Sequence, residues 1–448
     1  MNERGQRRLA RLARALLLVA GVVCYGLFQP APAPAQDAPV KDARYYSQRA
    51  AEAYKEKNYS AHLDNMKMAQ ALRPNHPTLI YNLAGAYALV GDREQALRLL
   101  ARVADMGLVY PAEREDDFAS LRDTEEFKKI LQKFDRNKAP AGESRLAFTI
   151  GEKGLIPESV AYDPVNETFY VGSVYQRKIL SSDKHGTVRE FSSEHDGLWS
   201  AMGMKVDAGR RHLWVATTAH PQMARFKEAE NGASALFKYD LKSGRLLKKY
   251  LLPNDSRKHW LGDLAINSRG DVFATDSLTP AVYTIQHQKD ELELFISDAS
   301  FVSLQGLDFT ENERQLFVAD YSKGVFVIDL ATKKVSNVAT TPDSMLLGID
   351  GLYFYKDSLI AIQNSAAPHR VVRLFLNKNH QGISHWKVVE ANNPAFDEPT
   401  LGVLVKDTFY YIANSQWGAI DRKGQLAQPD KLREPIILKT KLSEKRLN

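Results

Sequence analysis

Four acidic or amide residues stand at matching points in the second half of the chain, each at the beginning of a short apolar segment. If these segments are arranged about one axis, their side chains converge, and converging carboxylates are costly unless they bind something positive. Oxygen ligands of this kind suit Ca²⁺, Mg²⁺ or Mn²⁺, which predicts a divalent-cation site. The alternative is that they satisfy backbone donors at strand starts or face water. The four residues are Glu158, Asp263, Gln305 and Asp350.

The segments that carry these residues belong to a longer repeat. Each copy has a small or polar residue, an alternating apolar strand, a tight polar turn and a second strand, as in "QGLDFTENERQLFVADY". The copies begin at steps of 42 to 61 residues, enough for four antiparallel strands each. Six such units predict an all-β fold, a six-bladed β-propeller. They begin at Glu158, Met202, Asp263, Gln305, Asp350 and Thr400.

Strand direction places the starts of all six units around one mouth of the central channel, together with the loops that follow each second strand. We expect the ring to close by pairing residues near Ser144 with the last unit, or alternatively through residues near Pro435. His369 lies on a loop of this face and is a candidate proton acceptor, although a loop histidine is commonly a surface residue. Trp417 is a candidate for stacking a sugar or a flat ligand.

Residues 42–135 have a helical pattern instead. Two stretches align at an offset of 34 residues, so that Ala50 matches Ala84 and Leu63 matches Leu97. A helix, a turn and a helix at this period resemble the tetratricopeptide repeat, an all-α module. Such repeats offer a groove for a protein partner, or serve as a structural appendage. Residues 136–144 are the expected linker, and residues 145–448 the expected propeller.

Residues 1–35 have the features of a secretory signal. Five arginines precede an apolar stretch too short to span a membrane, and small residues around Ala35 suit cleavage. Without this segment the net charge falls from +6 to +2, because it holds five Arg and one Glu, so no basic footprint favours nucleic acid. The single cysteine, Cys24, also lies in it. We expect a periplasmic or secreted bacterial protein without a membrane span in its mature chain.

The blade starts and phrases such as "DGLYFYKDSLIAIQN" resemble the senescence-marker-protein, gluconolactonase and luciferin-regenerating-enzyme superfamily over about residues 145–448. The resemblance implies one divalent cation, usually Ca²⁺, in the central channel, and hydrolysis of lactones or related esters. It assigns the first-blade glutamate to Glu158 and the fifth-blade aspartate, a ligand suspected of base chemistry, to Asp350. The fourth-blade asparagine falls on Gln305. The third-blade Asn-Asp pair falls on Gly262 and Asp263, so its asparagine is missing.

Two functions follow from these features. In a metal-dependent hydrolase of lactones or esters, the cation would polarise the carbonyl while Asp350 or a nearby histidine, His369, takes a proton from water. The second is a propeller that binds a ligand or protein without catalysis, with the helical repeats as a docking module. "WLGDLAINSRGDVFATDS" resembles bacterial relatives of the royal-jelly and yellow proteins, which look like binding propellers. Glu158 and Asp350 favour the hydrolase, whereas Gln305 and Gly262 favour the binding protein.

Overall fold

The structure, a computed structural model, describes residues 41–253, 255–421 and 423–442. The described residues form two compact units: residues 41–100 with 112–127, and residues 101–111 with the described residues from 128 to 442. The predicted signal segment lies outside the described residues. No helix within the described ranges is long and apolar enough to cross a membrane.

The helical region consists of paired helices of similar length that are separated by short turns. Asp42 and Asn58 cap the first two helices by accepting the amide hydrogens of Tyr45 and Ala61, and Pro77 occupies the first turn of the third. The third helix starts 34 residues after the first, and the fourth 34 residues after the second. This spacing agrees with the predicted period. The helices are α2 (Ala43–Lys55), α3 (Tyr59–Leu72), α4 (Pro77–Leu89), α5 (Arg93–Asp105) and α6 (Glu125–Lys138), with 3₁₀ turns at Ala112–Arg114 and Asp116–Leu121.

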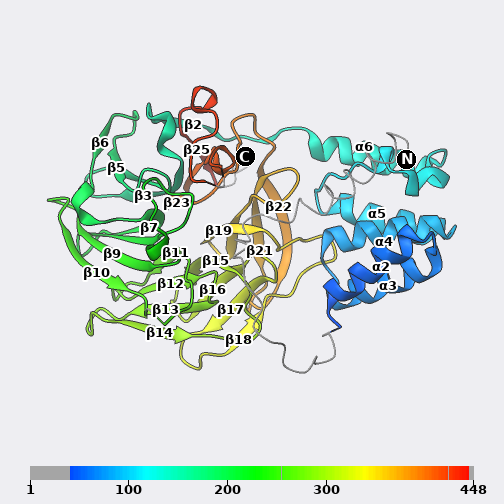
Figure 1. Cartoon of the computed structure of the whole chain (residues 1–448), viewed down its shortest axis with the longest axis horizontal. Coiled ribbons are helices and arrows are strands. Elements are labelled where there is room, and N and C mark those ends of the chain that lie inside the picture. Colours follow the sequence, from blue (N-terminus) through cyan, green and yellow to red (C-terminus); the bar gives the residue numbers. More distant parts are fainter. Residues whose placement is uncertain (1–40, 254, 422, 443–448) are drawn as a thin grey trace, which may run out of the picture. The chain divides into compact units, whose positions relative to one another are not determined.

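The predicted six-bladed propeller is confirmed by six antiparallel sheets (Figure 1). Alternating apolar residues give each strand one face toward each neighbouring blade. The first three blades each contain four strands in chain order. Blade one is β3 (Pro157–Asp163), β4 (Thr168–Ser173), β5 (Ile179–Ser182) and β6 (Val188–Glu190); blade two is β7 (Ser200–Asp207), β8 (His212–Thr218), β9 (Ser234–Asp240) and β10 (Leu246–Leu251); blade three is β11 (Leu261–Ile266), β12 (Val272–Asp276), β13 (Ala281–Ile285) and β14 (Leu292–Ile296).

The last three blades continue this order with two additions from the start of the propeller sequence. Blade five gains a fifth strand, β1 (Ala141–Gly142), which pairs with β22 and lies within the expected linker. The other strands are β15 (Leu304–Phe309), β16 (Gln315–Asp320), β17 (Gly324–Asp329) and β18 (Val335–Asn337) in blade four; β19 (Ile349–Phe354), β20 (Ser358–Gln363), β21 (Arg370–Leu376) and β22 (Ile383–Ala391) in blade five; and β23 (Gly402–Val405), β24 (Thr408–Ile412), β25 (Ile436–Lys441) and β2 (Arg145–Thr149) in blade six.

The ring closes through blade six, which is built from both ends of the propeller sequence. β25 pairs with β24 on one side and with β2 on the other, so both segments expected to close the ring take part (Figure 1). Each innermost strand also contacts the innermost strands of both neighbouring blades. Closure leaves the propeller without an open side.

The core lies between successive blades. Leu213 and Phe237 of blade two, for example, pack with Ala161 and Tyr170 of blade one. Aspartates fix the turns that follow several second strands: Asp276 accepts the amide hydrogens of Leu278 and Thr279 at the end of β12. This framework holds the innermost strands, and with them the predicted site residues, around one axis.

Candidate functional site

The predicted site residues lie where the innermost strands depart from regular pairing. In blades one to five, the pairing of the innermost strand with the second strand shifts register at the same point. A bulge of this kind re-aims a side chain. The shifted segments contain all four predicted ligands: Glu158, Asp263, Gln305 and Asp350.

Glycines allow neighbouring innermost strands to approach closely at these bulges. A Cβ at Gly306 would lie 2.4 Å from the amide nitrogen of Leu352, and a Cβ at Gly203 would lie 2.5 Å from the Cα of Asp263. In blades four and five the acid or amide precedes the glycine. Blade three has the reverse order, Gly262 and then Asp263, so Asp263 takes the position that glycine takes in blades two, four and five.

Four acids act on one another electrostatically, and we call them the acid cluster: Glu158, Asp263, Asp350 and Glu398. Burial and the nearby charge of Asp350 raise the pKa of Glu158 well above its usual range. Burial, followed by the charges of Glu398 and Asp263, raises the pKa of Asp350 to about 7. Burial raises the pKa of Glu398 to about 7 as well. A positive ligand would relieve this repulsion.

Two hydrogen bonds orient the acids of blades one and five. The indole Nε1 of Trp417 donates to Oε2 of Glu158 at 2.7 Å, and Nδ2 of Asn364 donates to Oδ2 of Asp350 at 2.9 Å. The hydroxyl of Tyr321 in turn donates to Oδ1 of Asn364 at 2.8 Å, which fixes the orientation of that amide. Among the described residues, no hydrogen bond is recorded to the other carboxylate oxygen of either acid.

Asp263 has a different neighbour, Lys205 of β7. The Nζ of Lys205 lies 4.0 Å from Oδ1 of Asp263 and 4.7 Å from the ring centre of Tyr353. Oδ1 also accepts the amide hydrogen of Leu264 at 2.8 Å, whereas the buried Oδ2 has no partner among the described residues. Burial still raises the pKa of Asp263, and the lysine partly opposes that rise. Asp263 is therefore only partly neutralised by the protein.

Gln305 lies against Gly262, the blade-three residue that precedes Asp263. Its Oε1 is 3.3 Å from the position that a Cβ at Gly262 would take, and its Nε2 donates to Oγ of Ser303 at 3.3 Å. The two departures from the family pattern are thus next to each other. The longer side chain in blade four reaches toward the position that has no side chain in blade three.

The donor chemistry of these residues fits a hard divalent cation. Carboxylate and amide oxygens are its preferred ligands, and the unpartnered, buried Oδ2 of Asp263 is such an oxygen. The described part of the chain has no group of three or more His, Cys, Asp or Glu side chains arranged to hold a metal ion. The three predicted carboxylates, those of Glu158, Asp263 and Asp350, therefore do not form such a group, and the predicted set also includes the amide oxygen of Gln305. The metal site therefore stays a prediction.

The histidines of this face have separate surroundings. His369 is half-buried on the loop between β20 and β21; burial lowers its pKa, and Asp397 is the acid whose charge opposes that change. Its catalytic role stays a prediction. His220 is buried between Trp260 and Trp417, with ring centres 4.6 and 5.6 Å away, and burial lowers its pKa to about 3. It forms an aromatic wall with these indoles, next to Glu158.

Sequence reasoning missed two charged residues of the site. Glu398 precedes β23 in an irregular segment and does not stand at a strand start. Lys205 is the lone basic residue of an innermost strand that is otherwise mostly apolar, "SAMGMKVD". A single charge in such a strand is the sequence feature that could have indicated a site residue. Tyr321 and Asn364 lie on loops that follow second strands, which the sequence places at this face, and the structure adds that they form one hydrogen-bonded chain to Asp350.

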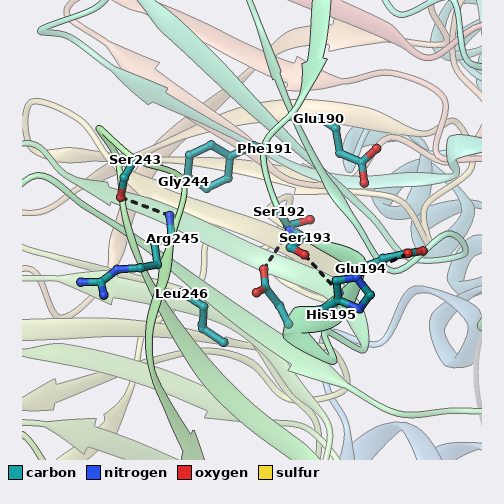
Figure 2. Close-up of a pocket in the computed structure, with 11 residues that line it drawn as sticks. Glu190, Phe191, Ser192, Ser193, Glu194, His195, Ser243, Gly244, Arg245 and Leu246 are labelled. Carbon is teal, nitrogen blue, oxygen red and sulfur yellow. Dashed lines mark hydrogen bonds and ion pairs between the residues drawn. The ribbon is translucent and has the colours of Figure 1, made fainter.

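A separate hollow of about 710 Å³ lies on blades one and two. Figure 2 shows its two sides, the turn that carries Ser193, Glu194 and His195 and the segment from Ser243 to Leu246. It contains none of the predicted site residues. The acid cluster, and not this hollow, is the candidate site.

The fold and site define a six-bladed β-propeller with buried acids on its innermost strands. The sequence matches no protein-family model and no curated protein. Similar solved structures include a gluconolactonase from Xanthomonas campestris, with 15% identity, a TM-score of 0.46, and coverage of 67% of this chain and 90% of that one. A PQQ-bound aldose sugar dehydrogenase from Streptomyces coelicolor has 13% identity, a TM-score of 0.45 and coverage of 67% and 99%. A luciferin-regenerating enzyme has 12% identity, a TM-score of 0.45 and coverage of 67% and 95%.

Proposed function

We propose that the acid cluster is the site of a hydrolase that acts on lactones or related esters and requires a divalent cation. The observation that carries the proposal is the convergence of two buried acids, Glu158 and Asp350, with the half-buried Glu398, all with raised pKa and few positive neighbours. Such perturbed acids are favoured at functional sites. We further propose that the protein acts in the periplasm or outside the cell, where the predicted signal would direct it.

The residues that would hold the cation are Glu158, Asp350 and Gln305, with Asp263 through its unpartnered Oδ2. Ca²⁺, Mg²⁺ and Mn²⁺ all accept such oxygen ligands. When bound, the cation supplies a Lewis acid that polarises the substrate carbonyl and stabilises negative charge on its oxygen. The protein's part is to orient the carboxylates, which Trp417 and Asn364 do by hydrogen bonds to two of them, and these hydrogen bonds partly oppose the rise in pKa that burial causes.

Asp350 is the proposed general base. Its pKa of about 7 lets it accept a proton from water near neutral pH, and the hydrogen bond from Asn364 leaves its other oxygen for that proton. His369 is the second proposed acceptor. Burial lowers its pKa, so its imidazole is neutral and able to take a proton at neutral pH.

A binding function without catalysis is favoured by one specific observation, the aromatic wall of His220, Trp260 and Trp417. Three aromatic rings that pack against one another beside Glu158, two of the pairs tilted and one stacked, suit a flat or sugar-like ligand. The helical repeats would then be a second docking surface, for a protein partner.

The test is the metal content of the purified mature protein, followed by Ca²⁺ and Mn²⁺ titrations monitored by melting temperature and then a lactone and ester panel. The hydrolase predicts a stoichiometric cation, or a saturable rise in melting temperature, together with turnover. Cation binding without turnover on the panel would favour the binding function. Neither binding nor turnover would contradict the proposal.

A further inference from the structure

Arg370, the first residue of β21, is a buried cation outside the acid cluster. It is 1% exposed, and burial lowers its pKa to about 10, so it remains positively charged. Its Nε donates to Oε1 of Gln363 at 2.7 Å, and its Nη1 donates to the carbonyl of Met106 at 2.6 Å. A buried charge is costly unless its donors are satisfied, so these two acceptors are needed.

Met106 belongs to a short segment that is part of the propeller's compact unit, residues 101–111. It follows the end of α5, where backbone carbonyls lack helical partners and carry partial negative charge. Gly107 comes next, with a φ of +70°, and a Cβ there would lie 2.8 Å from Nη1 of Arg370. Two residues on, the amide of Val109 donates to the carbonyl of Ala367 at 2.8 Å.

Both contacts of this segment are made to one hairpin of blade five. Arg370 and Gln363 are partners in the pairing of β20 and β21, and Ala367 lies in the loop between those strands. We call residues 364–369 the hairpin loop. Gln363 is itself anchored, because its Nε2 donates to the carbonyls of Met345 and Leu347 at 2.8 and 2.9 Å.

The hairpin loop begins with Asn364, whose amide holds the carboxylate of Asp350. We propose that residues 106–109, through Arg370, position the hairpin loop and thereby the carboxylate of Asp350. Arg370 is then a positioning residue of the site, acting through Gln363 and Asn364. The consequence for the site rests on the proposed hydrolase function, whereas the fixing of the loop does not.

The test compares Arg370→Met with Arg373→Met. Arg373 is a second buried arginine of β21, but it donates to Oγ of Ser358 and the carbonyl of Leu442, away from the hairpin loop. Hydrogen exchange of residues 364–369 is measured first, in the full-length mature protein. We expect at least about tenfold faster exchange of this loop in Arg370→Met and unchanged loop exchange in Arg373→Met.

Steady-state kinetics on a lactone substrate provide the second readout. Arg370→Met should lower kcat about tenfold or more with little change in KM, because the base is misplaced while the substrate contacts remain. Arg370→Lys, which keeps one charged donor, should recover part of kcat. If Arg370→Met does not fold, Val109→Pro removes the amide donor to Ala367 and gives the same exchange test.

The outcomes separate the two proposals. Equal loop exchange in the wild type and in Arg370→Met, or equal loosening in both arginine variants, overturns the positioning role. If the wild type shows no turnover, the hydrolase function fails while the exchange comparison still decides whether Arg370 fixes the loop. Faster exchange with unchanged kcat would restrict Arg370 to holding the loop and overturn its role in positioning Asp350.

Discussion

The side-chain oxygen of Gln305 lies 3.3 Å from the position that a Cβ at Gly262 would take. The two positions therefore form a complementary pair, because the absence of a side chain at Gly262 leaves space that the glutamine approaches. In the proposed cation site, blade four supplies an amide and blade three supplies none at Gly262.

The first prediction concerns this pair. Gly262→Asn alone should weaken cation binding about tenfold, because its Cβ crowds Gln305, whereas Gly262→Asn with Gln305→Asn should bind more tightly than the wild type. Calorimetric titration with Ca²⁺ measures both. Gln305→Asn alone is the matched control. Additive effects of the two substitutions would contradict the coupling of these positions.

The second prediction concerns the general base. Asp350→Asn should lower kcat about 10²- to 10⁴-fold, the range that a positioned base supplies, and should also weaken cation binding. Circular dichroism should show an intact fold. Asp163→Asn is the control, since Asp163 is another buried acid of the propeller, at the opposite end of β3 from Glu158, where it accepts hydrogen bonds from Arg211. Normal turnover by Asp350→Asn would place the site elsewhere.

The third prediction concerns pH. Asp350 and Glu398 have folded-state pKa values raised to about 7, so the unfolded chain releases these protons at lower pH than the folded protein does. Stability in the absence of cations should therefore fall as pH rises from about 4 to about 7 and then level off. Melting temperatures across this range measure it. Asp350→Asn should make the melting temperature depend less steeply on pH. An unchanged dependence would show that Asp350 does not contribute to the loss of stability.

Turnover should change with pH in the opposite direction. The ionised form of Asp350 is the proposed base, so kcat should rise as pH increases through about 7. Saturating cation should shift this rise to lower pH, because positive charge favours the ionised carboxylate. A pH-rate profile at two Ca²⁺ concentrations measures the shift, and identical profiles would contradict cation binding at Asp350.

The fourth prediction concerns Trp417. Trp417→Phe removes the donor to Oε2 of Glu158 while keeping a ring to stack on His220. Loss of a hydrogen bond to a buried carboxylate costs about 1–3 kcal/mol, which corresponds to a loss of about 5- to 150-fold in cation affinity. The control is the same cation titration of Trp260→Phe, because the indole of Trp260 belongs to the same aromatic wall. The difference between the two variants isolates the contribution of the hydrogen bond to Glu158. Equal losses in both variants would assign the effect to packing alone.

The sequence was sufficient to predict the propeller because strand alternation repeats in every blade. The unit starts coincide with the innermost strands, and Glu158, Gln305 and Asp350 all lie at bulges there. The position of Asp263 was only approximately predicted. In the bulge of blade three, Gly262 precedes Asp263, whereas in blades four and five the glycine follows the acid or amide. The order within a bulge depends on how closely the next blade approaches and not on the apolar pattern.

Other features could not be predicted from periodicity. Lys205 is one basic residue in an apolar strand, and its proximity to Asp263 depends on how two blades meet. Glu398 lies in an irregular segment, where no repeat marks its position. The pairing of β1 with β22 joins residues far apart in the chain, so the expected linker gave no local sign of a strand.

Blade six combines the first and last strands of the propeller, since β25 lies between β24 and β2. During synthesis, β2 is made long before its partner exists, so the ring can be completed only when the final strand emerges. A chain that ends before Ile436 would leave β2 without a strand partner and β24 paired with β23 alone, and would open the ring instead of merely shortening it. Completion of the propeller therefore requires that synthesis has passed β25.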